Sequence, residues 1–253
     1  GVNFIINVGS QYDTSTRAVE LAKQYTQCYA AIALHPIHLF EQEVDEEESH
    51  FTTRAEDFLP ERYAALVKSS AKVVAVGECG LDYFHFPSNV SEAEVKAKQR
   101  SSLEAQIGFA REHDLPLIIH CRNAYDDLFE VLKSAADAGR LPKQPGVNHC
   151  FLGNREQAKK FLDLGFLLSF TGIITFKNVT PELLEVIKET PLERIMVETD
   201  SPYLAPTPYR GKRNEPAYVI EVAKKIAQLK GVTVEEVDNV TSKNARQLFG
   251  VPI

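Results

Sequence analysis

Short apolar runs alternate with longer amphipathic stretches along the whole chain. The apolar runs are rich in β-branched residues and leucine, which is typical of strands buried on both faces. They predict seven strands, at Asn3–Val8, Cys28–Leu34, Val73–Gly77, Pro116–His120, Gly146–His149, Phe166–Phe170 and Arg194–Val197. Because strands and helical stretches alternate, the pattern predicts a parallel sheet.

Apolar residues at helical spacing predict the helices between and after these strands. The longest extends from Glu92 to about His113. The others are expected at Thr14 to about Tyr25, Arg62–Ser69, Tyr125–Ala138, Arg155–Leu164, Pro181–Lys188, Pro216–Lys230 and Val234–Phe249. The acidic stretch Glu41–Asp57 has few large apolar residues and predicts a surface loop, with at most a helical turn.

No composition break or long linker divides the chain, so we expect one domain over residues 1–253. This length suits a (β/α)8 barrel, in which the active site lies at the carboxyl ends of the strands. Only seven strands are predicted, and the chain starts at what should be the second strand. The expected fold is therefore an α/β, TIM-type (β/α) barrel that lacks its first strand in this chain.

Four of the predicted strands lead into a side chain that can bind a metal ion. These side chains are Glu78, His120, His149 and Asp200. A carboxylate next to a buried strand is costly without a positive partner, and a metal ion is a common one. A lone histidine after a strand is more often a hydrogen-bonded residue, but four such residues at four strand ends favour a metal site.

Two histidines and two carboxylates can surround one or two divalent ions. Imidazole suits zinc, manganese or iron, and carboxylate suits these ions and magnesium. His35 also follows a strand, but a His-Pro pair is equally typical of a turn. The remaining histidines are expected to be exposed or to cap helices: His38, His50, His85 and His113.

Basic and polar residues follow the same strand ends. Arg122 comes two residues after His120, and a loop containing Arg210, Arg213 and Asn214 follows Asp200. Alone, this loop is more typical of a solvated surface, but near a metal centre its charges favour phosphate binding.

The net charge of −7 argues against a broad basic surface for nucleic acid, although metal ions can neutralise phosphate locally. No apolar run reaches the roughly 18 residues of a membrane helix, and the chain shows no secretory signal. The four cysteines form no C-x-x-C pair, so reduced thiols and a cytoplasmic location are expected. We expect no membrane partner and see no sign of an obligate protein partner.

The chain resembles the TatD family of metal-dependent deoxyribonucleases, within the amidohydrolase-like metal hydrolases. The resemblance spans nearly the whole chain, in the family's order. Its motifs are Ala33–Pro36, Gly77–Tyr83, Leu117–Arg122, Val147–Phe151, Glu198–Leu204 and Arg213–Pro216. The motifs around Glu78 and Asp200 are specific, whereas the histidine motifs are weaker alone.

The resemblance implies a distorted TIM barrel that hydrolyses phosphodiester bonds, typically from the 3′ ends of DNA, with magnesium or another divalent ion such as manganese or zinc. Glu78 would bridge two ions, and His120 and His149 would complete the shell of one. Asp200 would hold the other ion and orient or deprotonate the attacking water. Phosphate or nucleotide contacts are implied for Arg122, Arg210, Arg213 and Asn214.

The sequence departs from the family in having no His-x-His motif, which the family carries on its first strand. Its place lies before Gly1, so we expect one ion to bind well and the ion at Asp200 to bind poorly. Two alternatives to a nuclease remain, because the same barrel and ligands support many reactions and because the His-x-His motif is absent. One is an amidohydrolase-like enzyme for a small ester, amide or lactone, and the other is a catalytically impaired metal-binding protein.

Overall fold

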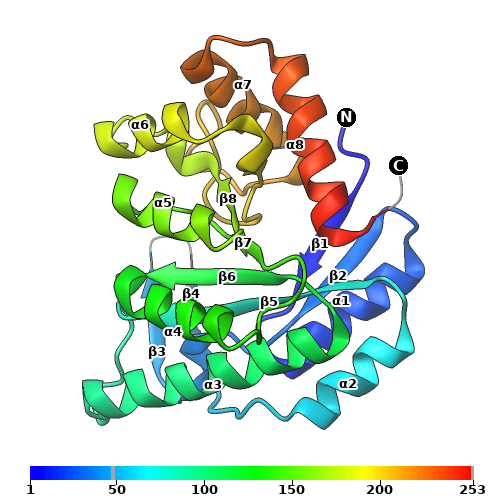
Figure 1. The fold of residues 1–253 in the computed structure, drawn as a ribbon, viewed down its shortest axis with the longest axis vertical. Helices are drawn as coiled ribbons and strands as arrows, with labels where there is room; N and C mark the ends of the chain where they lie inside the picture. Colours follow the sequence, from blue (N-terminus) through cyan, green and yellow to red (C-terminus); the bar gives the residue numbers. More distant parts are fainter. Residues whose placement is uncertain (47–48, 252–253) are drawn as a thin grey trace. The chain divides into compact units, whose positions relative to one another are not determined.

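The computed structural model describes residues 1–46 and 49–251, which fall into two compact units. One unit is residues 3–146, and the other is residues 147–253 with residues 1–2. Each unit is built from parallel strands and helices that alternate along the chain (Figure 1). The α/β class and the seven predicted parallel strands are confirmed in the part of the chain described. The single domain over residues 1–253 stays a prediction.

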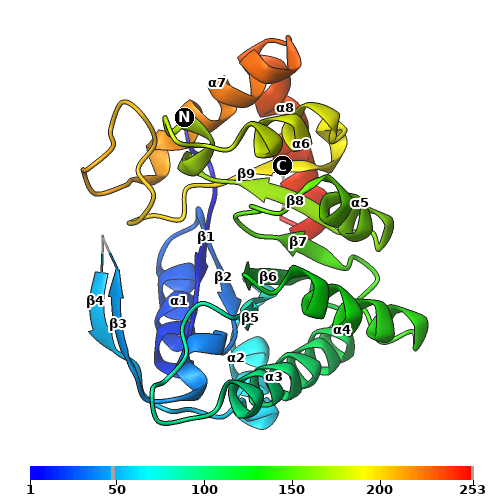
Figure 2. The ribbon, with the colours of Figure 1, turned by 90° about the vertical axis from the view of Figure 1, so that its left-hand side faces the viewer.

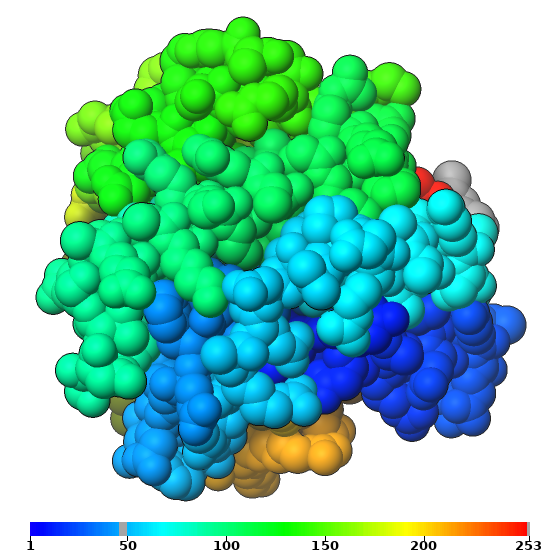
Figure 3. Space-filling view, turned by 90° about the horizontal axis from the view of Figure 1, so that it is seen from below, coloured from blue at the N-terminus to red at the C-terminus, as the bar shows by residue number. Residues whose placement is uncertain are grey.

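Residues 3–146 contain four parallel strands in the order β1-β2-β5-β6. They are β1 (Ile5–Val8), β2 (Cys28–Ile32), β5 (Val73–Asp82) and β6 (Leu117–Arg122). The helices of this unit are α1 (Tyr12–Gln24), α2 (Pro60–Ser69), α3 (Glu92–His113) and α4 (Tyr125–Asp137), with a 3-10 turn η1 (Pro36–Leu39). Helices α1, α3 and α4 pack against β2, β5 and β6. Seen from below, α2 and α3 form much of this unit's surface (Figure 3).

The acidic stretch that was expected to be a surface loop contains a β-hairpin instead. Strands β3 (Glu43–Glu46) and β4 (Ser49–Thr52) pair antiparallel (Figure 2), and residues 47–48 lie outside the described part. The loop prediction was wrong because a two-stranded hairpin needs few apolar residues. Val44 of β3 is buried, and the Thr53 hydroxyl closes the base of the hairpin by donating to the Phe40 carbonyl at 2.6 Å.

Two buried glutamines of α3 hold the chain segments that lead into the site. Gln106 accepts from the Leu34 backbone N–H and donates to the Leu34 carbonyl, both at 2.9 Å. Gln99 makes the same pair of bonds to the backbone of Asp82, both at 2.8 Å. The two glutamines are seven residues apart, so they lie on one face of the helix. Each amide therefore satisfies a backbone donor and acceptor that ordinary sheet pairing does not use.

Replacing Gln106 with alanine should lower the free energy of unfolding by about 2–6 kcal/mol. The change leaves two buried backbone groups of Leu34 without partners, at about 1–3 kcal/mol each. Urea denaturation measures the loss as a shift of the midpoint at constant slope. Glu104→Ala, at an exposed position of the same helix, is the matched control. A midpoint shift no larger for Gln106→Ala than for the control would contradict the role assigned to Gln106.

Residues 147–253 contain the parallel order β7-β8-β9. These strands are β7 (Gly146–Asn148), which begins at the unit boundary, β8 (Leu167–Phe170) and β9 (Ile195–Val197). The helices are α5 (Arg155–Asp163), α6 (Pro181–Glu189), α7 (Val219–Lys230) and α8 (Val234–Phe249), with 3-10 turns η2 (Gly172–Thr175), η3 (Leu192–Arg194) and η4 (Pro216–Tyr218). The predicted helix Pro216–Lys230 thus begins as a 3-10 turn. None of the helices in the described residues is long and apolar enough to cross a membrane.

Candidate active site

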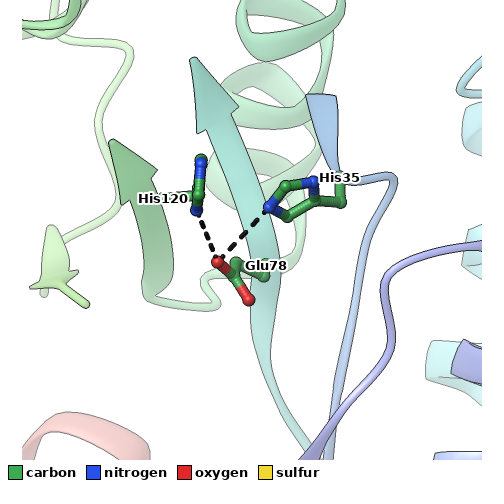
Figure 4. Close-up of side chains that lie close together, drawn as sticks. All are labelled: His35, Glu78 and His120. Atoms are coloured by element: carbon green, nitrogen blue, oxygen red, sulfur yellow. Dashed lines mark hydrogen bonds and ion pairs between the residues drawn. The ribbon is translucent and has the colours of Figure 1, made fainter. Parts of the chain in front are cut away.

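Three side chains from neighbouring segments of the sheet converge in residues 3–146. Glu78 comes from β5, His120 from β6, and His35 follows β2 (Figure 4). Oε1 of Glu78 lies 2.8 Å from Nδ1 of His120 and 3.5 Å from Nε2 of His35. One ligand atom from each residue lies within 4.8 Å of the others, a grouping that suits one metal ion. Two of the four predicted ligands, Glu78 and His120, are therefore adjacent.

Glu78 occupies an irregularity in the sheet. The register between β5 and β6 shifts between Gly77 and Cys79, which pair with consecutive residues of β6. Such a bulge turns a side chain away from the regular alternation. Gly77 is needed here because a Cβ would lie 2.4 Å from the Ile118 side chain. Strand β5 was predicted to end at Gly77, but it continues to Asp82, so Glu78 lies inside the strand.

His120 lies between two carboxylates. Its Nδ1 faces Glu78, and its Nε2 lies 3.0 Å from Oδ2 of Asp82. Burial lowers the pKa of His120, but the hydrogen bonds to Asp82 and Glu78 and their charges outweigh it and raise the pKa to about 9. Burial likewise opposes the charge of Asp82, yet hydrogen bonds from His120 and His85 hold the pKa of this carboxyl well below its usual range.

His35 is held in one tautomer by its own turn. Its Nδ1 accepts from the Ile37 backbone N–H at 3.3 Å, so the proton is on Nε2, which faces Glu78. Burial and the charge of His120 lower the pKa of His35, which keeps the ring neutral. In this state His35 orients the Glu78 carboxylate by donating to it.

These donors fit a divalent ion. A histidine nitrogen and a carboxylate oxygen point at each other, which is a mixed donor set used by zinc, manganese and iron. Metal-binding histidines commonly bind a carboxylate through their other nitrogen, which fixes the ring. Asp82 does this for His120, and Asp82 itself is 1% exposed. Glu78 and His120 would therefore hold the ion, with Asp82 fixing the His120 ring.

Asp82→Asn should weaken metal affinity by about 10- to 100-fold. Oδ1 of Asp82 accepts from the backbone N–H groups of Phe84 and His85. The asparagine oxygen would keep those bonds, which turns its NH₂ toward Nε2 of His120. The proton of His120 would then sit on Nδ1, which is the nitrogen needed for the metal. Calorimetric titration with manganese measures the change, with the exposed Asp127→Asn as control. Equal affinities in both variants would contradict this role of Asp82.

The other two predicted ligands lie together in residues 147–253. Nδ1 of His149 is 2.7 Å from Oε2 of Glu198, and its Nε2 is 4.0 Å from Oδ1 of Asp200. Oε1 of Glu198 accepts from the Cys150 backbone N–H at 2.7 Å. The arrangement repeats that of His120, since one carboxylate fixes the ring and a second carboxylate lies at the other nitrogen. Joint coordination of an ion by Glu78, His120 and His149 stays a prediction.

Asn214 holds the loop that carries Asp200. Its side chain is 2% exposed and donates to the carbonyls of Thr199 at 2.8 Å and Tyr203 at 2.6 Å. The Asp200 backbone has φ of 57°, a left-handed conformation that aspartate tolerates better than most residues. These contacts make Asn214 a support for the loop, and its predicted contact with a nucleotide stays a prediction.

The predicted phosphate-binding arginines are partly or fully exposed. Arg122 is at the end of β6 with its guanidinium 3.7 Å from the centre of the Phe84 ring. Arg210 lies in the same way over Phe176, at 4.3 Å. Arg213 is exposed on the loop before Asn214. Both distances place a guanidinium over the face of an aromatic ring, as in a cation–π contact. Their contact with phosphate stays a prediction.

Three residues of the two groups were not among the predicted site residues. They are His35, Asp82 and Glu198, which contact the predicted ligands. Asp82 and Glu198 lie in the Gly77–Tyr83 and Glu198–Leu204 motifs, and an acidic residue within these motifs was the available signal. His38 and His85 were expected to be exposed or capping. That was wrong for His38, which is buried beside Phe51, and His85 is half-buried against Asp82.

Comparison with known proteins places the chain in a family. The model of the TatD related DNase family matches residues 1–250. The uncharacterized metal-dependent hydrolase YabD of Bacillus subtilis is 40% identical over 99% of this chain and 88% of its own length. The 3′-5′ ssDNA/RNA exonuclease TatD of Klebsiella pneumoniae is 31% identical over 100% of this chain and 89% of its own.

A solved structure supports the same assignment. The crystal structure of YjjV, a TatD homologue from Escherichia coli K12, matches with a TM-score of 0.83 and 30% identity, over 100% of this chain and 88% of that one. The resemblance drawn from the sequence motifs, and with it the TIM-barrel class, is confirmed. The chain belongs to the TatD related DNase family.

Proposed function

We propose that this member of the TatD family, a metal-dependent hydrolase, removes nucleotides from the 3′ end of single-stranded DNA. The relatives named as exonucleases support the substrate class, since one of them aligns with the whole chain. The proposal has two specific elements: the substrate is DNA, and hydrolysis starts at its 3′ end.

The observation that carries the proposal is the repeated histidine–carboxylate arrangement. His120 lies between Asp82 and Glu78, and His149 lies between Glu198 and Asp200. In both cases one carboxylate fixes the imidazole and the other lies where an ion would bind. A divalent ion bound there supplies charge neutralisation for a phosphate and makes water a better nucleophile.

The candidate site residues have different roles in phosphodiester hydrolysis. A water oxygen attacks phosphorus, the bond from phosphorus to the 3′ oxygen of the preceding nucleotide breaks, and that oxygen takes a proton from solvent. Asp200 accepts the proton of the attacking water at a carboxylate oxygen. Glu78 and His120 hold the ion, and Arg122, Arg210 and Arg213 donate to the phosphate oxygens. We propose magnesium as the ion in use, with manganese and zinc as the alternatives.

The test is nucleotide release from a single-stranded DNA labelled at its 5′ end. We expect products shortened one nucleotide at a time from the 3′ end, dependent on magnesium or manganese and abolished by EDTA. The same DNA with a 3′-terminal phosphorothioate linkage should resist hydrolysis. Shortening from the 5′ end or internal cutting would contradict the polarity that we propose.

Two other outcomes would favour the alternatives to a nuclease. Hydrolysis of a small carboxylic ester, amide or lactone without any action on DNA would favour an amidohydrolase-like enzyme. Metal binding with no hydrolysis of any of these substrates would favour a metal-binding protein without catalysis. Single-stranded RNA, tested beside the DNA, measures the preference between the two nucleic acids.

Binding of single-stranded DNA should depend only modestly on salt. The chain has 28 Lys and Arg residues against 35 Asp and Glu residues, a net charge of −7, so its overall charge does not attract phosphate and the expected contacts are those of the three proposed arginines. If three arginines each neutralise one phosphate, the slope of log K against log salt should be about −2. Fluorescence anisotropy in EDTA measures this slope without hydrolysis, and a slope several-fold steeper would contradict it.

A further inference from the structure

We propose that Phe84 is a stacking surface for a nucleobase of the single-stranded substrate, and that Arg122 completes it. The inference rests on the proposed function for the class of ligand. It adds a binding position for the base, whereas the metal centre and the arginines account only for the phosphate.

Phe84 is a large apolar side chain that the fold leaves in solvent. It is 53% exposed, the highest value among the exposed large hydrophobic side chains of the described residues. A single exposed phenylalanine is common on protein surfaces and needs no explanation by itself. The placement of this one carries the inference, because its backbone is fixed to the candidate metal centre.

One carboxylate connects Phe84 to the metal centre. Oδ2 of Asp82 lies 3.0 Å from Nε2 of His120, and Oδ1 of Asp82 accepts from the Phe84 backbone N–H at 2.9 Å. Gln99 in turn holds the backbone of Asp82 through two bonds of 2.8 Å. The Phe84 backbone is therefore fixed relative to His120 within residues 3–146. A base on this ring would lie near the phosphate that the metal centre binds.

Arg122 gives this surface a charge that matches nucleic acid. Its guanidinium carbon lies 3.7 Å from the centre of the Phe84 ring, and the side chain of Arg122 leaves β6 two residues after His120, on the same side of the strand. The guanidinium covers one face of the ring, so a base would stack on the other face, and the guanidinium adds positive charge to this surface. A nucleotide presents the complementary pair, a flat base and an anionic phosphate.

This geometry favours a single strand over other ligands. Bases of a single strand have exposed faces that stack on aromatic side chains with little preference for sequence. In a duplex those faces are covered by neighbouring base pairs, so Phe84 would have nothing to stack on. A small aliphatic ester would use neither the ring nor the guanidinium, which sets this site apart from a small-ester pocket.

The test compares Phe84→Ala and Phe84→Trp with the parent protein in binding single-stranded DNA. Fluorescence anisotropy in EDTA excludes hydrolysis, and the DNA carries either normal bases or abasic residues at its 3′ end. The parent should bind the normal strand about 5- to 150-fold more tightly than the abasic strand. Phe84→Ala should lose this difference, and Phe84→Trp should keep it. Tyr25→Ala, which removes another exposed aromatic side chain at 48% exposure, should bind like the parent.

The outcomes separate this inference from the proposed function. Equal binding of normal and abasic strands by the parent, or an unchanged preference in Phe84→Ala, would overturn the role of Phe84 whether or not DNA is hydrolysed. The protein could instead prefer normal over abasic strands, lose this preference in Phe84→Ala, and hydrolyse no DNA. That result would contradict the proposed nuclease activity and support the role of Phe84 in stacking. Unchanged thermal unfolding of the variants checks that the fold is intact.

Discussion

Replacing Glu78 with glutamine should lower kcat for single-stranded DNA by about 10³-fold. A bound divalent ion contributes several kcal/mol to stabilising the transition state, and each 1.36 kcal/mol is about tenfold in rate. Glutamine has nearly the shape of glutamate but no charge. Oε1 of Glu78 lies 2.8 Å from Nδ1 of His120 and 3.5 Å from Nε2 of His35, so the change removes the charge on which both rings converge.

The Glu78 prediction is checked by single-turnover hydrolysis with saturating magnesium and by calorimetric titration with manganese. We expect weaker metal binding together with the loss of rate, because the carboxylate is a ligand. Glu104→Gln makes the same chemical change at an exposed position of α3 and should alter neither property. Full activity in Glu78→Gln would exclude this carboxylate from the reaction. Normal metal affinity together with lost activity would show that Glu78 contributes to catalysis in another way than as a metal ligand.

The strands and helices could be predicted because their signals are local. The run Val73–Gly77 is apolar at every position before Glu78, and helix Glu92–His113 shows its spacing over many turns. The same local rule identified Glu78, His120, His149 and Asp200, since each follows an apolar run. In the structure, Oε1 of Glu78 lies 2.8 Å from Nδ1 of His120, and Nε2 of His149 lies 4.0 Å from Oδ1 of Asp200.

What could not be predicted depends on contacts between distant parts of the chain. Asp82 and His120 are 38 residues apart, and Glu198 and His149 are 49 apart, so no spacing rule joins them. The hairpin of β3 and β4 was missed because its strands carry acidic residues and pair mainly with each other. His38 was missed for a related reason, since one of its aromatic neighbours is Phe51 on that hairpin.

Replacing Asp200 with asparagine should lower kcat by about 10²- to 10⁴-fold, the usual contribution of a positioned proton acceptor. Asparagine cannot take the proton of the attacking water. It does tolerate the left-handed backbone that Asp200 adopts at φ of 57°, so the loop should keep its conformation. The supports of that loop, which are the bonds from Asn214 to the Thr199 and Tyr203 carbonyls, do not involve the Asp200 side chain.

Metal concentration separates the two roles implied for Asp200. If this carboxylate only holds an ion, excess magnesium or manganese should restore kcat in Asp200→Asn. If it accepts the proton, kcat should stay low at saturating metal while KM for DNA changes little, because the proton is transferred only in the transition state. We expect the second result. Asp163→Asn, at an exposed position of the same unit, is the matched control and should leave kcat and KM unchanged. If excess metal alone restores the parental rate, Asp200 acts as a metal ligand, and another group accepts the proton of the attacking water.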